Sequence, residues 1–279
     1  MTGGVVIGHF RLDPYLDRIG IDAPVTPDLA TLKLLHAAHA EVIPFEGLDP
    51  LLGRPVRLDL DALQAKLVDS RRGGYCYEQN LLFKAALEAI GFAVTPLGAR
   101  VRWVYPPDSP LGPKEHAVLK VDLPEGAYLA DVGFGACVMD APLALSPEVE
   151  QPTAMGVYRL AERDGHYWLS AKQPGGWRTM YAFDLAPQLA SDYELGNYYT
   201  STSNRAPFTS MLIMEKVGRD RRVKLVNTRL LVEARDGEPA EQRALETPEA
   251  LGEALDAQFN VAPPVPVEAI FAKVSGRPA

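Results

Sequence analysis

Apolar residues recur at helical spacing through the first third of the chain. Leu29, Leu32 and Leu35 share one face of a helix, and the segments 60–67 and 81–90 repeat the spacing. Prolines and glycines mark where these segments begin and end. We therefore expect the first third of the chain to be mainly helical.

The spacing changes to alternation after residue 91. Apolar and polar positions alternate through 94–103 and 116–123, which is typical of half-buried strands. Asp164-Gly165 separates two further alternating segments and predicts a tight hairpin. We expect residues 92–196 to form antiparallel strands.

The last part of the chain, residues 197–279, mixes both patterns. The segments 211–217 and 222–232 read as strands, and Thr247-Pro248 begins a segment with helical spacing. The predicted class is α+β, with helices first, antiparallel strands next and an α/β region last.

Composition narrows the range of functions. The chain has 279 residues, 47% of them hydrophobic, and a formal net charge of −8, which argues against a nucleic-acid binder because phosphate neutralisation needs clustered Lys and Arg. The chain has two cysteines, too few for a disulfide-stapled domain, and no Cys/His cluster has metal-ligand spacing. We find no signal peptide or membrane-spanning run, and expect a cytoplasmic protein that binds no metal.

Cys76 is the first candidate for chemistry. Gly73 and Gly74 allow a tight turn directly before it, and helical spacing begins directly after it. A cysteine at a helix N-terminus faces unpaired N–H groups and the positive end of the helix dipole, which favour the thiolate. The same N–H groups could stabilise an oxyanion. The alternative is that Cys76 is a small buried side chain.

A thiol nucleophile needs a base, and His116 is the best placed of the five histidines because it begins a strong strand pattern. Asp131 falls on the next predicted strand, where it could orient the imidazole. A carboxylate within an apolar strand is costly unless it is paired. The alternative for Asp131 is a cap on the glycine-rich turn that follows. We expect the other cysteine, Cys137, to be structural.

These segments resemble the arylamine N-acetyltransferases. The run Arg72-Gly73-Gly74-Tyr75-Cys76-Tyr77-Glu78-Gln79-Asn80 looks like the signature of that family. Ile43-Pro44-Phe45-Glu46, His116 after a proline-rich loop, Asp131 to Gly135 and Asn197 to Thr202 follow in the family's order.

The resemblance implies a fold of three parts: a helical bundle (1–91), a central antiparallel β-barrel (92–196) and a C-terminal α/β lid (197–279). It also implies a catalytic core like that of cysteine proteases and transglutaminases, with a Cys76–His116–Asp131 triad.

The resemblance also implies ligands and further site residues. Acetyl-coenzyme A would be the acyl donor and an arylamine or hydrazine the acceptor, and a homodimer is compatible with the family. The remaining residues match family positions that line the acceptor pocket (Phe45, Val101 and Phe134), brace the active site (Glu46 and Arg72) or contact the coenzyme (Gly135, Thr209 and Ser210). Gly47, Glu115 and the segment 203–207 depart from the family's pattern.

We therefore expect a two-step transfer through an acetyl thioester on Cys76. Two alternatives remain open from the residues. One is a cysteine hydrolase or transglutaminase-like enzyme that uses water or a peptide amine, and the other is a binding protein on a degenerate version of the same fold.

Overall fold

The computed structural model describes residues 9–277, and its first third is helical. α2 (Leu29–Val42) and α5 (Cys76–Ile90) are the long helices of this region. The Asp28 side chain caps α2 by accepting from the Thr31 N–H, and Gly91 ends α5 with a φ of 107°. The shorter helical elements are α1 (Leu12–Ile19), α3 (Leu48–Leu51), α4 (Leu60–Leu63) and the π-turn η1 (Gln64–Val68).

An eight-stranded antiparallel sheet follows, in the spatial order β5-β4-β3-β2-β9-β8-β7-β6. Its strands are β2 (Ala93–Val101), β3 (His116–Leu123), β4 (Gly126–Ala130), β5 (Leu143–Ala144), β6 (Glu150–Pro152), β7 (Val157–Arg163), β8 (His166–Gln173) and β9 (Gly176–Pro187).

The sheet curls into a nearly closed barrel. Its two edge strands are joined through one side chain: Gln151 accepts from the Ala144 N–H at 2.7 Å and donates to the Ala144 carbonyl at 2.9 Å. The Gln151 amide thus takes the place of a backbone partner for β5 and covers an edge that would otherwise be unpaired.

The C-terminal part contains a second sheet with the order β1-β10-β11-β12-β13. Its strands are β1 (Phe45–Glu46), β10 (Ile213–Val217), β11 (Arg222–Val226), β12 (Arg229–Glu233) and β13 (Pro239–Ala244). The helical elements around it are α6 (Ala190–Thr202), η2 (Pro207–Thr209), η3 (Arg235–Gly237), α7 (Pro248–Ala257) and α8 (Val267–Val274).

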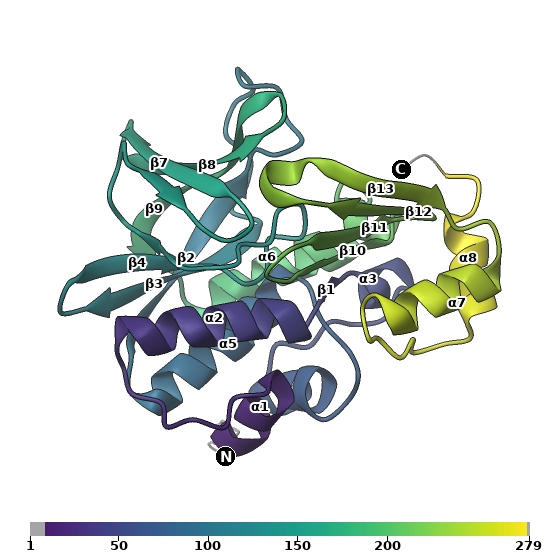
Figure 1. Ribbon diagram of the computed structural model, residues 1–279, viewed down its shortest axis with the longest axis horizontal. Coiled ribbons are helices and arrows are strands. Elements are labelled where there is room, and N and C mark those ends of the chain that lie inside the picture. The colour runs from purple at the N-terminus through teal and green to yellow at the C-terminus, as the bar shows by residue number, and fades with distance from the viewer. Residues whose placement is uncertain (1–8, 278–279) are drawn as a thin grey trace, which may run out of the picture.

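Figure 1 shows how these parts meet. The N-terminal helices lie under the barrel, the green sheet lies beside it, and α7 and α8 cover the far end of that sheet. Phe83 and Leu87 of α5 pack in one apolar core with Leu119 and Val121 of β3, so the helix that begins at Cys76 is fixed against the strand that begins at His116.

The expected α+β fold with a central barrel is confirmed. One strand was predicted wrongly, because 222–232 is a hairpin whose turn contains Asn227 with a φ of 54°. α8 and β13 were not predicted. The division at 91/92 and 196/197 stays a prediction, although α6 runs across the second position. Within residues 9–277 no helix is long and apolar enough to cross a membrane.

Candidate active site

The turn before Cys76 depends on two glycines for a steric reason. A Cβ on Gly73 would lie 1.9 Å from the Pro44 carbonyl oxygen, and one on Gly74 would lie 2.8 Å from Glu78 Cβ. Neither glycine has a positive φ, so what they permit is close approach of backbones and not a left-handed turn. Cys76 follows as the first residue of α5 and is 4% exposed.

His116 and Asp131 form a buried pair. His116 Nε2 lies 2.7 Å from Asp131 Oδ2, and the two side chains are 3% and 0% exposed. Burial by itself lowers the pKa of His116, but the charge of Asp131 and the hydrogen bonds to Asp131 and Cys76 outweigh it and raise the pKa to about 10. Burial would raise the pKa of Asp131, yet the His116 charge and several donors hold it below its usual value.

The sulfur of Cys76 completes the group. Cys76 lines the same cavity as His116 and contributes to the raised pKa of the imidazole, and its sulfur lies 3.9 Å from the Glu115 carbonyl oxygen. Because Nε2 of the imidazole is taken by Asp131, the contact with the sulfur falls to Nδ1. The structure thus brings all three predicted catalytic residues together at one place.

Asn80 supports this group and was missed from the sequence. Its Nδ2 donates to Asp131 Oδ1 at 2.9 Å and to the Ala117 carbonyl at 2.7 Å, while its Oδ1 accepts from the Val132 N–H at 3.1 Å. The signal was a polar residue four positions after Cys76, on the same face of α5.

Three rings enclose the imidazole and its carboxylate. Phe134 and Tyr181 each have ring centroids 5.1 Å from that of His116. His36, behind them, is fully buried, and its Nε2 accepts from the Asp131 N–H at 3.3 Å. Burial lowers the pKa of His36 to about 4, so it packs as a neutral ring, as expected of a core histidine.

The predicted supporting pair, Glu46 and Arg72, forms a buried ion pair. Arg72 Nε lies 2.7 Å from Glu46 Oε1, and the same guanidinium contacts Asp49 at 3.2 Å. Lys66 extends the network from Asp49 (2.6 Å) to Glu78 (2.7 Å). Glu78 accepts from the Tyr75 N–H at 3.1 Å, so this network of charged side chains extends from Glu46 in β1 to the residue before Cys76.

A cavity of about 140 Å³ opens above Cys76 and His116. The three residues predicted for the acceptor pocket, Phe45, Val101 and Phe134, all line it, and so does Gly135. Its other lining residues are Trp103, Val104, Tyr105, Glu115, Gly133, Ala136, Thr200, Arg205, Ala206, Pro207, Phe208 and Ile213. Most of this surface is aromatic or aliphatic, which suits a flat ring.

Thr209 and Ser210 lie beyond the lining of this cavity. The Thr209 hydroxyl donates to the Ser203 and Ala206 carbonyls, and the Ser210 hydroxyl donates to that of Pro207. Their contact with a coenzyme stays a prediction. Among residues 9–277 no group of three or more His, Cys, Asp or Glu side chains could hold a metal ion.

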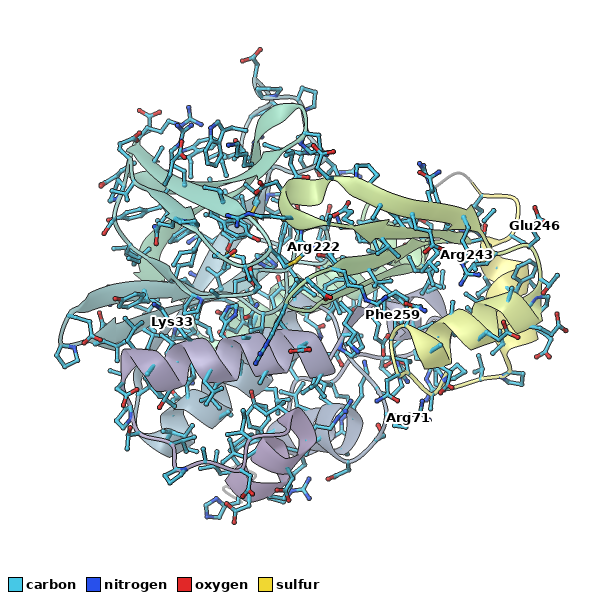
Figure 2. All side chains as sticks on the ribbon, in the orientation of Figure 1. Lys33, Arg71, Arg222, Arg243, Glu246 and Phe259 are labelled. Atoms are coloured by element: carbon cyan, nitrogen blue, oxygen red, sulfur yellow. The ribbon has the colours of Figure 1, made fainter. Side chains whose placement is uncertain are left out.

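Cys137 is buried at the junction between the barrel and the C-terminal sheet. Its sulfur accepts from the Arg222 guanidinium at 3.0 Å, and Figure 2 labels Arg222 at the centre of the molecule. Arg222 also donates to the Val138 carbonyl at 2.8 Å, and Glu215 accepts from the Val138 N–H at 2.7 Å. This clamp holds the segment that follows Phe134 and Gly135.

Known proteins share this arrangement. The N-acetyltransferase family model matches residues 28–264. The arylamine N-acetyltransferase of Mycolicibacterium smegmatis is 44% identical over 224 residues, which cover 79% of this chain and 82% of that protein. The arylamine N-acetyltransferase / N-hydroxyarylamine O-acetyltransferase of Salmonella typhimurium is 40% identical over 203 residues, covering 73% and 72%.

Solved structures agree with these matches. The M. smegmatis arylamine N-acetyl transferase superposes with a TM-score of 0.91 at 39% identity, covering 96% of this chain and all of that chain. The Mycobacterium marinum enzyme, solved in complex with CoA, gives 0.89 at 38% identity, covering 95% and 99%.

Fold and matches together define an acyltransferase. The chain belongs to the arylamine N-acetyltransferase family.

Proposed function

We propose that this chain moves the acetyl group of acetyl-coenzyme A to the nitrogen of an arylamine or arylhydrazine, through an acetyl thioester on Cys76. The observation that carries the proposal is the buried 2.7 Å contact between His116 and Asp131, beside Cys76 and under an apolar cavity. The relative from M. marinum was solved with CoA, which supports the choice of donor.

In the first step, the Cys76 thiolate attacks the carbonyl carbon of the donor and coenzyme A leaves as a thiol, taking a proton from the His116 imidazolium. The first turn of α5 has N–H groups without partners inside the helix, and these donors are available to stabilise the oxyanion. The negative charge of Asp131 stabilises the protonated form of His116 until the proton passes to the leaving thiolate.

In the second step, the amine enters beside Phe45 and Phe134 and attacks the acetyl-cysteine. His116 accepts a proton from the attacking nitrogen, the amide leaves, and Cys76 returns to the thiolate. An arylamine is unprotonated at neutral pH, so its lone pair is available, and the aromatic lining holds its ring.

The test is mass spectrometry of the intact protein after incubation with acetyl-coenzyme A alone. We expect a mass gain of one acetyl group, absent in Cys76→Ala and retained in Cys137→Ser, since the second cysteine bonds to Arg222 away from the cavity. Adding an arylamine should remove the gain and yield the amide. Release of free acetate at the same rate without any amine would favour the hydrolase alternative.

The assembly and location of the protein are also proposed. We infer a homodimer in the cytoplasm. Leu189, Leu195 and Tyr198 are 67–72% exposed around α6 and offer an apolar contact. Sedimentation velocity of the purified protein tests the dimer, and a single species of monomer mass would contradict it.

A further inference from the structure

We propose that Glu115 selects the acceptor. Its unpaired carboxylate in the cavity wall favours acceptors with a positive charge or a second N–H group, and it disfavours arylamines that carry a carboxylate. This inference rests on the proposed function, because it concerns the amine used in the second step.

The backbone of Glu115 is fixed at the cavity. Its N–H donates to the Ala99 carbonyl at 3.1 Å, and its own carbonyl oxygen lies 3.9 Å from Cys76 Sγ. Glu115 lines the cavity together with Tyr105 and Thr200. Besides burial, its charge raises the pKa of both Tyr105 and Tyr77, so the carboxylate lies near these two phenols.

The carboxylate has no cation beside it. Within residues 9–277 no hydrogen bond or ion pair joins the Glu115 side chain to another group, and the neighbouring Lys114 is paired with Asp184 at 3.0 Å. Arg205 lines the same cavity, but it is exposed and forms no ion pair with Glu115. Among the described residues that line the cavity, Glu115 is the one carboxylate.

The charge of Glu115 acts across the cavity. Burial raises the pKa of Tyr105, and the Glu115 charge raises it further. Burial also raises the pKa of Glu115 itself, and the charge of the neighbouring His116 imidazolium partly offsets this. A half-buried carboxylate with no protein partner is stabilised most by a ligand that brings a cation or an N–H donor to it.

The remaining walls determine what else such a ligand must be. Phe45, Trp103 and Phe134 provide aromatic surfaces, so an acceptor would place its ring among them and its donor group towards Glu115. An arylhydrazine fits because it has an N–H group besides the attacking nitrogen. An aniline with an ammonium substituent fits equally, whereas a carboxylate substituent would face a like charge.

The experiment compares three para-substituted anilines of similar size: 4-aminobenzoate, 4-aminobenzamide and 4-(aminomethyl)aniline. Each reacts in a single turnover with enzyme that already carries acetyl-Cys76. We expect Glu115→Gln to lower the rate ratio of the cationic to the anionic acceptor at least roughly fivefold, the factor given by unit charges about 4 Å apart in water. The neutral amide should react with both enzymes at similar rates.

Glu125→Gln is the matched control, because it removes one exposed charge from the turn after β3, at the opposite end of the strand from His116. Its rate ratio should equal that of the unmodified protein. Equal ratios in Glu115→Gln and the unmodified protein would overturn the proposal.

The acetylation of Cys76 is measured separately by mass. If acetylation fails, the proposed function fails. The selectivity is then decided by binding of the three anilines to the unacetylated protein, measured by tryptophan fluorescence, because Trp103 lines the cavity. The cationic ligand should bind more tightly than the anionic one, and this preference should be lost in Glu115→Gln.

Discussion

Replacing Asp131 by asparagine should disable the proposed base while leaving its shape unchanged. Asp131 Oδ1 accepts from Asn80 Nδ2 and the Gly133 N–H, both at 2.9 Å, so the oxygen of the introduced amide must take this position. The NH2 group of that amide then faces His116 Nε2, which must accept. The imidazole proton moves to Nδ1, where it faces the sulfur, and His116 can no longer take the thiol's proton.

The size of the effect follows from the pKa of His116, which rises from 6.5 to about 10. This rise corresponds to about 5 kcal/mol, or a factor of ~10³ in the ratio of imidazolium to imidazole. Burial without the Asp131 charge acts in the opposite direction. We therefore expect acetylation of Cys76 at pH 7 to slow by ~10³-fold or more in Asp131→Asn.

The assay is single-turnover acetylation followed by mass, together with the rate of alkylation by iodoacetamide from pH 5 to 10. Asp122→Asn, on the exposed part of β3, is the control and should behave like the unmodified protein. Acetylation within tenfold of the unmodified rate, together with an unaltered alkylation profile, would refute the reasoning.

Three further predictions concern the surroundings of the site. Arg72→Met should lower the free energy of unfolding by about 3–5 kcal/mol, because it leaves the buried Glu46 carboxylate without its ion-pair partner. The control Arg71→Met removes an exposed ion pair and should lower it by less than about 1 kcal/mol. Urea unfolding midpoints of the two variants measure the difference. Burial lowers the pKa of His36 to about 4, so the unfolded chain binds this proton more readily, and stability is lost as the pH falls from about 6.5 towards 4. His36→Gln should flatten that loss in thermal melts, and an identical slope would count against it. Gly135→Ala would place a Cβ 2.2 Å from the Phe45 ring, so the acceptor KM should rise about tenfold or more while Cys76 is still acetylated; an unaltered KM would contradict the clash.

Turns and helix ends that carry glycine or Asp-Gly signals were predicted correctly from the sequence. Asp164-Gly165 forms the β7–β8 turn with positive φ at both residues, and Gly91 ends α5 in the left-handed region. The turn within 222–232 has Asn227 in the left-handed region and contains no glycine, so the sequence showed no clear turn signal and the hairpin was read as one strand. β13 is exposed at every position, so it has no apolar alternation that a sequence could display.

Long-range contacts account for most of what the sequence could not predict. β1 pairs with β10, with Phe45 opposite Glu215, and no local pattern encodes that partner. The two residues of β1 are too few to show a periodicity of their own. The meeting of Cys76, His116 and Asp131 was predictable because each residue stands beside a distinctive local signal. The contacts of Asn80 and His36 with Asp131 are tertiary contacts that no local signal encodes.

The position of Asn80 has a consequence for the polypeptide while it is still being synthesised. Its hydrogen bonds to Ala117, Asp131 and Val132 form only when α5 packs against the barrel, and this packing also brings His116 to the sulfur. A growing polypeptide that has completed its helices, but not yet its strands, carries an ordinary thiol. Reactivity therefore emerges only after His116 and Asp131 have been synthesised and packed against α5.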